Sequence, residues 1–196
     1  MNKSLIVSLF ALSIFSASLP SEASETDTLL VRAKAGPSFY SNVNPVTSTF
    51  GVGLDLGFRN VNGLGLAGAA RLNFLGSGQD EVNSNTTVRT EVKSLFLGII
   101  PSYAVSKGIA TLSFGLGLGV LSLTTQTDTF VTLPTSSTSS TPETTKSRFA
   151  IAPTFEMDFA IASGLFANVG AQYIVGLGDS PKPGIISPMV GIGYNF

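Results

Sequence analysis

The stretch from Gly184 to Phe196 is GIISPMVGIGYNF, and every second residue in it is a large apolar one. A period of two predicts a β-strand whose two faces lie in different surroundings. The apolar face consists of Ile186, Pro188, Val190, Ile192, Tyr194 and Phe196, and the opposite face of Ser187, Met189, Gly191, Gly193 and Asn195.

The same alternation occurs seven more times upstream, in residues 28–40, 46–59, 64–75, 88–105, 109–122, 146–161 and 165–177. The connections alternate in length. Tight turns at 60–63, 106–108 and 163–164 alternate with longer polar stretches at 41–45, 76–87, 124–145 and 178–184. A meander with every second connection tight places all tight turns at one end. This pattern predicts an all-β protein, an eight-stranded antiparallel up-and-down transmembrane β-barrel.

The composition suits a membrane barrel. Mean hydropathy is +0.38 and only 12% of residues are charged, against about 25% in an ordinary soluble domain. Beyond the first residues, no run of about 18 apolar residues predicts a transmembrane helix. The formal net charge of −1 argues against a nucleic-acid partner, because no basic surplus is available to neutralise phosphates.

Residues 1–23 are predicted to be a signal peptide, with Lys3 at its start, an apolar segment from Leu5 to Phe15, and Ser21 and Ala23 before the cleavage point. Residues 24–196 are then expected to form one outer-membrane β-barrel domain. The sequence contains no cysteine, which excludes a lipoprotein and a disulfide.

Two arguments decide which face of each strand points outward. The interior of an eight-stranded barrel has room only for side chains, so we expect the face rich in Gly, Ala and Ser to pack inside. A cation facing lipid would cost roughly 2–4 kcal/mol. The charged residues on the small-residue face are Arg32, Lys34, Asp55, Arg71, Glu156 and Asp158. A soluble barrel with an apolar interior is the alternative that these arguments reject.

These six residues are expected to form an interior ion-pair network. Counting from the end with tight turns, Arg32 lies at the depth of Asp158, and Lys34 at the depth of Glu156, with Asp55 and Arg71 joining. Such a network would block a continuous channel. The interior glycines leave two alternatives open, because they either accommodate long Arg and Lys side chains or line a narrow water path.

The fourth strand, residues 88–105, leaves its facing open. The charged residues Arg89, Glu91 and Lys93 fall on the same face of a regular strand as the apolar residues Leu95, Leu97 and Ile99. Either the charged half protrudes above the membrane, or a bulge switches the faces. Aromatic residues are expected to form two interfacial girdles, one of Phe58, Phe159, Tyr194 and Phe196 and one of Phe39, Phe50, Phe74 and Phe149.

With these features, the chain resembles the small eight-stranded outer-membrane barrels of Gram-negative bacteria: the OmpA transmembrane domain, OmpX and the Opa/NspA group. The most specific stretch is Gly191-Ile192-Gly193-Tyr194-Asn195-Phe196, which is similar to the terminal signal read by the barrel-assembly machinery. The resemblance implies integral location in the outer membrane, Tyr194 and Phe196 as parts of the assembly signal, and both termini in the periplasm. It implies no single activity, since members serve as adhesins, structural anchors and occasionally lipid-modifying enzymes.

The residue types restrict the chemistry. Without His or Cys, the chain cannot build a Ser–His relay or the usual zinc and copper sites, so we expect no catalytic residues, metal or cofactor. A calcium site at Asp80 and Glu81 is a weak alternative. Glu156 and Asp158, about 6–7 Å apart along one strand, would permit acid–base chemistry, although an ion-pair network is favoured.

The sequence therefore predicts a non-enzymatic outer-membrane barrel with a structural or cell-surface interaction (adhesion-type) role; the alternative is a narrow pore for small solutes or ions. A carboxylate-based enzyme is the third hypothesis. The expected partners are outer-membrane lipid, the barrel-assembly machinery and an extracellular ligand bound through residues 124–145.

Overall fold

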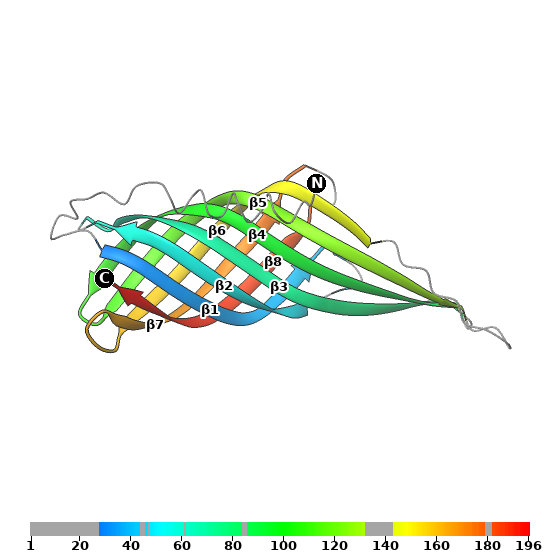
Figure 1. Cartoon of the computed structure of the whole chain (residues 1–196), viewed down its shortest axis with the longest axis horizontal. Coiled ribbons are helices and arrows are strands. Elements are labelled where there is room, and N and C mark those ends of the chain that lie inside the picture. Colours follow the sequence, from blue (N-terminus) through cyan, green and yellow to red (C-terminus); the bar gives the residue numbers. More distant parts are fainter. Residues whose placement is uncertain are drawn as a thin grey trace, which may run out of the picture.

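The eight strands form one closed barrel in which each strand pairs with its neighbours in the sequence and β1 pairs with β8 (Figure 1). The computed structural model describes residues 28–43, 46, 48–60, 62–83, 86–131, 143–178 and 182–196. The predicted signal peptide lies outside the described residues. The strands are β1 (Thr28–Ser41), β2 (Ser48–Arg59), β3 (Leu64–Asn83), β4 (Thr86–Lys107), β5 (Ala110–Val131), β6 (Glu143–Ala160), β7 (Leu165–Gly176) and β8 (Gly184–Asn195). The predicted fold class is confirmed.

Burial confirms the predicted facing of the strands. Leu54 and Phe155 are 45% and 43% exposed, whereas Arg71 and Glu156 are 1% and 8% exposed. Removing the apolar surface from water requires a lipid environment around the barrel. In the described part of the chain, none of the elements is a helix long and apolar enough to cross a membrane.

Three tight turns lie at one end of the barrel, and each has a glycine in the left-handed region. Gly63, Gly108 and Gly164 have φ values of 83°, 61° and 74°, a conformation that a side chain disfavours. The C-terminus lies at the same end (Figure 1), where the Phe196 backbone N–H donates to the Leu29 carbonyl over 2.9 Å. We call this the turn end and the opposite one the outer end.

The predicted loop at 76–87 is wrong over most of its length, and the one at 124–145 is wrong over the residues that the structure describes. β3 continues to Asn83 and β4 begins at Thr86, while β5 continues to Val131 and β6 begins at Glu143. These segments are mostly polar in sequence, so they lack the alternation of apolar side chains from which the strands were predicted. Backbone pairing and the β-propensity of threonine hold them as strands instead. Residues 132–142, the middle of the predicted binding loop, lie outside the described residues.

The two alternatives for the fourth strand are resolved by the burial along β4. Thr90, Val92, Ser94 and Phe96 are buried, and Arg89 and Lys93 are exposed, so one parity faces inward along the whole strand. The charged half faces outward beyond the lipid-facing Ile99. A bulge does occur, but in β3, where the register with β4 shifts between Asn73 and Gly76.

The expectation of a small-residue interior is only partly correct. Large apolar side chains also point inward in the outer half of the barrel. The buried apolar cluster consists of Val46, Val92, Phe96, Leu121, Leu123, Ala150, Ala152, Ile174 and Ile185, with Tyr40 and Val43 packed against it. Several strands are apolar on both faces in the outer half of the barrel, so alternation in size does not extend over their whole length.

Candidate functional site

The interior near the turn end contains ion pairs that cross the lumen. Arg32 on β1 contacts Glu156 Oε2 at 2.6 Å and Asp158 Oδ2 at 2.5 Å, both on β6. The Arg32 guanidinium also lies 5.7 Å from the Phe166 ring centroid, a cation–π arrangement. Because β1 and β6 are not neighbours in the barrel, these contacts bridge separate walls.

A second set of ion pairs continues toward the outer end. Lys34 contacts Glu156 and also Asp55, whose Oδ2 is 2.5 Å from the Lys34 Nζ. Asp55 Oδ1 lies 2.5 Å from Arg71 Nη1. The structure therefore places all six predicted residues in one connected cluster. In it, Glu156 forms ion pairs with Arg32 and Lys34, and Asp55 forms ion pairs with Lys34 and Arg71.

Sequence reasoning missed three members of this cluster. Arg59 on β2 reaches Asp158 at 3.5 Å and donates to the Ser113 hydroxyl at 3.0 Å. Asn168 on β7 donates to Asp158 Oδ1 at 2.6 Å. Arg59 shares a parity with Asp55, which is the signal that would have found it. Its position beside a tight turn made it resemble a solvated residue.

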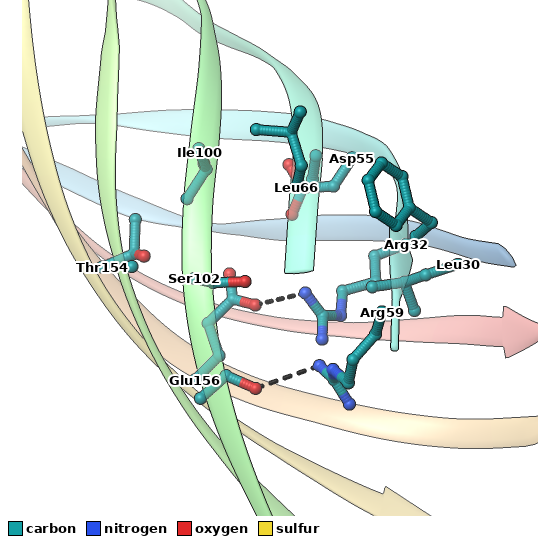
Figure 2. A pocket seen from close by; sticks show the side chains of 13 residues that line it. Leu30, Arg32, Asp55, Arg59, Leu66, Ile100, Ser102, Thr154 and Glu156 are labelled. Atoms are coloured by element: carbon teal, nitrogen blue, oxygen red, sulfur yellow. Dashed lines mark hydrogen bonds and ion pairs between the residues drawn. The ribbon is translucent and has the colours of Figure 1, made fainter. Parts of the chain in front are cut away.

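A small cavity lies within this cluster, with about 20 Å³ of space for the centres of water-sized spheres. Figure 2 shows Arg32 and Arg59 on one side of it and Glu156 opposite. A volume of this size has room for one or two water molecules. The Arg32 Nε atom, which is buried without a hydrogen-bond partner in the protein, is a candidate donor to such a water.

Above the ion pairs, a layer of hydrogen-bonded polar side chains crosses the lumen. Ser38 on β1 donates to Asn73 Oδ1 on β3 at 2.7 Å and lies 2.7 Å from the Ser187 hydroxyl on β8. Asn73 in turn donates to the Ser94 hydroxyl at 2.7 Å, and Tyr40 bonds the same hydroxyl at 3.1 Å. The apolar cluster follows, because Tyr40 also packs against it.

The interior glycines accommodate large side chains. A Cβ at Gly53 would lie 2.6 Å from Arg71 Cδ, and one at Gly193 would collide with the Phe166 ring. At Gly115, the nearest atom would be Thr154 Oγ1 at 2.6 Å. Of these three positions, only Gly53 lies beside a long cationic side chain, as the first alternative for the glycines has it. Gly193 and Gly115 lie beside Phe166 and Thr154 instead.

Outside the barrel, four strands continue as a projecting sheet (Figure 1). Pairing of β2 with β3 stops at Asn73, and pairing of β6 with β7 stops at Ala150, whereas the β3–β4, β4–β5 and β5–β6 ladders run on. We call residues 76–83, 86–94, 121–131 and 143–148 the outer sheet. Cross-strand pairs on its outer face include Thr124 with Thr145 at 3.0 Å and Ser122 with Ser147 at 2.8 Å.

The remaining predicted sites are less informative. Tyr194 and Phe196, the predicted assembly signal, are exposed and stack edge to face with ring centroids 4.7 Å apart. The side chains of Asp80 and Glu81 are outside what the structure describes. Among the described residues, no group of three or more acidic residues is arranged to hold a metal ion.

Comparison with known proteins shows a likeness of fold. No protein-family model matches the sequence, and a search of curated proteins found no match either. The structure is similar to that of Ail, the attachment invasion locus protein of Yersinia pestis, solved with the heparin analogue sucrose octasulfate; the TM-score is 0.55 and identity is 14%, over 88% of this chain and 100% of Ail. Neisserial surface protein A gives a TM-score of 0.53 at 14% identity over the same shares of the two chains.

At this identity the likeness concerns the fold. The closed barrel, its apolar exterior and its ionic interior define an integral β-barrel of the Gram-negative outer-membrane class.

Proposed function

We propose that this protein is a non-enzymatic outer-membrane barrel with a cell-surface interaction role, and that the outer sheet is its binding element. In this proposal the turn end faces the periplasm and residues 1–23 direct export. Tyr194 and Phe196 serve as the signal for barrel assembly.

The length difference between the strands carries the proposal. β4 and β5 have 22 residues each, whereas β2, β7 and β8 have 12. A transmembrane strand needs only about 9–11 residues. The additional residues of β4 and β5 are therefore available outside the bilayer, where they form an ordered polar surface.

The chemistry of the outer sheet suits recognition in water. Its outer face presents hydroxyl, amide and charged groups, and Arg89 pairs with Glu91 at 2.8 Å on that face. A rigid sheet loses little conformational freedom when a ligand binds, which favours affinity. The similarity in fold to an attachment protein is in keeping with this role.

A narrow pore is the second candidate, and the lumen disfavours it. Ion pairs, a hydrogen-bonded layer and an apolar cluster follow one another along β1, each joining several strands. A hydrated ion would have to pass all three. The cavity at the turn end has room for only one or two waters, which is too little for a path.

Removing residues 77–91 and 127–142, which include the distal part of the outer sheet, tests the proposal. Gly76 and Val92 are register partners, as are Gln126 and Glu143, so each pair is to be joined directly by an Asn-Gly turn. Cells of a non-adherent Gram-negative strain displaying this variant should bind epithelial monolayers and immobilised heparin at least tenfold less than cells displaying the full chain. Heat-modified gel mobility reports whether the barrel still folds.

Lys107→Ala is the matched control, because Lys107 is exposed at the turn end and should not affect adhesion. Adhesion that survives this deletion, in a variant that folds, would exclude the distal part of the outer sheet as the binding element.

A further inference from the structure

The outer sheet has two edges whose backbones lack a neighbouring strand among the described residues. Residues 76–83 of β3 pair only with β4, and residues 143–148 of β6 pair only with β5. Such edges carry rows of unpaired N–H and C=O groups that can accept a further strand. Both edges belong to every copy of the chain, and they are of similar length.

Insertion in a membrane restricts how the edges of two copies can meet. All copies have the turn end on the same side, so β3 runs outward and β6 runs inward in each of them. Two β6 edges, or two β3 edges, could therefore meet only in parallel. A β3 edge meeting a β6 edge is antiparallel, which gives the more stable ladder.

Charge distinguishes the same arrangements. Lys146 is exposed on the β6 edge, and the β3 edge includes Asp80 and Glu81. Pairing of two β6 edges brings Lys146 of one copy near Lys146 of the other. Pairing of a β6 edge with a β3 edge instead brings Lys146 to the edge whose sequence includes Asp80 and Glu81. Like charges directly opposite one another destabilise a ladder and opposite charges stabilise it.

The faces and charges together select a register. The outward faces continue from one copy to the next only if odd-numbered residues of β3 lie opposite odd-numbered residues of β6, since a slip of one residue reverses the faces. Placing Lys146 opposite Asp80 meets this condition and sets Ser147 opposite Gln79. A further slip of two residues would set Glu143 opposite Glu81.

From these observations we infer that copies of this protein associate side by side in the membrane, by antiparallel pairing of the β3 edge of one copy with the β6 edge of the next. The contact is heterologous, so the copy at each end of a row retains one unpaired edge, and the association can extend beyond a dimer. The inference shares with the proposed function the placement of the outer sheet outside the bilayer.

Cysteine cross-linking tests this association, since the chain has no native cysteine. S77C and S147C lie on the outward face of opposite edges. In the selected register they are diagonal neighbours, about 7–8 Å apart. Within one copy, three strand spacings of about 4.8 Å separate them, beyond the reach of a bismaleimide spanning about 8–10 Å.

Cells co-expressing S77C and S147C chains should give at least five times more cross-linked dimer than cells expressing either variant alone. A chain carrying both cysteines should give a ladder of dimer, trimer and higher species. T124C, on the inner strand β5 of the same sheet, is the matched control and should give only background. K146D should abolish the mixed dimer, and the charge-swapped double variant D80K/K146D should restore it.

Three results would overturn the inference: cross-linking that is as strong for one variant alone, absence of the ladder, or a cross-linked product whose mass shows a different protein at the edge. Labelling of S147C by a membrane-impermeant maleimide in intact cells tests separately whether the outer sheet is at the cell surface, as the proposed function requires. If S147C is labelled and no mixed dimer forms, only the self-association is wrong. If it is not labelled, the outer sheet is not at the cell surface.

Discussion

Arg32 Nη1 lies 2.6 Å from Glu156 Oε2 across the lumen, although 124 residues separate them in the chain. Glu156 also accepts Lys34, so one carboxylate neutralises two cations from β1. The side chains of all three residues are at most 10% exposed, which leaves little water to replace a lost partner.

Glu156→Gln should destabilise the barrel by about 3–5 kcal/mol, because it leaves Arg32 and Lys34 without one of their counter-charges in a buried position. The free energy of unfolding in urea, measured with the protein in lipid vesicles, checks this expectation. Glu143→Gln is the control: Glu143 is exposed, and its replacement should change the free energy by about 0.5 kcal/mol or less. Equal effects of the two variants would show that the ion pair contributes no more than a surface charge.

The wild-type protein should show no steady conductance in a planar bilayer, and Glu156→Gln should show none either. The reason is the apolar cluster, which includes Phe96 and Leu121 at 1% and 0% exposure and excludes water independently of the ion pairs. Adding Phe96→Ala and Leu121→Ala to Glu156→Gln should produce measurable conductance. Conductance of the wild type would favour the pore hypothesis instead.

Leu54→Arg should lower the folded fraction in vesicles by an amount corresponding to roughly 2–4 kcal/mol, since residue 54 faces lipid at mid-barrel. Thr145→Arg is the matched control, because Thr145 is also exposed but lies on the outer sheet, which the proposed function places outside the bilayer. It should have almost no effect. A similar loss at both positions would place Thr145 within the bilayer and would move the boundary of the outer sheet.

Gly193→Ala should destabilise the barrel by about 1–3 kcal/mol, a cost typical of overpacking. A Cβ there would collide with the Phe166 ring and lie 2.6 Å from the Val31 carbonyl oxygen. Gly68→Ala is the control, because its Cβ would meet only the Leu56 carbonyl oxygen, at 3.8 Å. Thermal unfolding followed by gel mobility compares the two, and equal stability would mean that Phe166 moves aside without cost.

The sequence by itself determined the number of strands, their order and the facing of all but the fourth strand. Alternation of apolar side chains depends only on the period of two, and Leu54 or Phe155 shows it locally without knowledge of any partner. The tight turns are equally local, because Gly63 and Gly164 supply conformations that few other residues adopt.

The tertiary structure alone decided which charges meet and how far the sheet extends. Depth in a barrel depends on the stagger between strands, which no single strand encodes, so the double pairing of Glu156 and the participation of Arg59 became visible only after closure. Beyond Val92 and Leu123, which belong to the apolar cluster, the outer sheet is mostly polar in sequence, and its order comes from backbone pairing with neighbouring strands. Alternation of apolar and small side chains identifies the strand segments that face lipid. It gives no information about a segment in which most residues are polar.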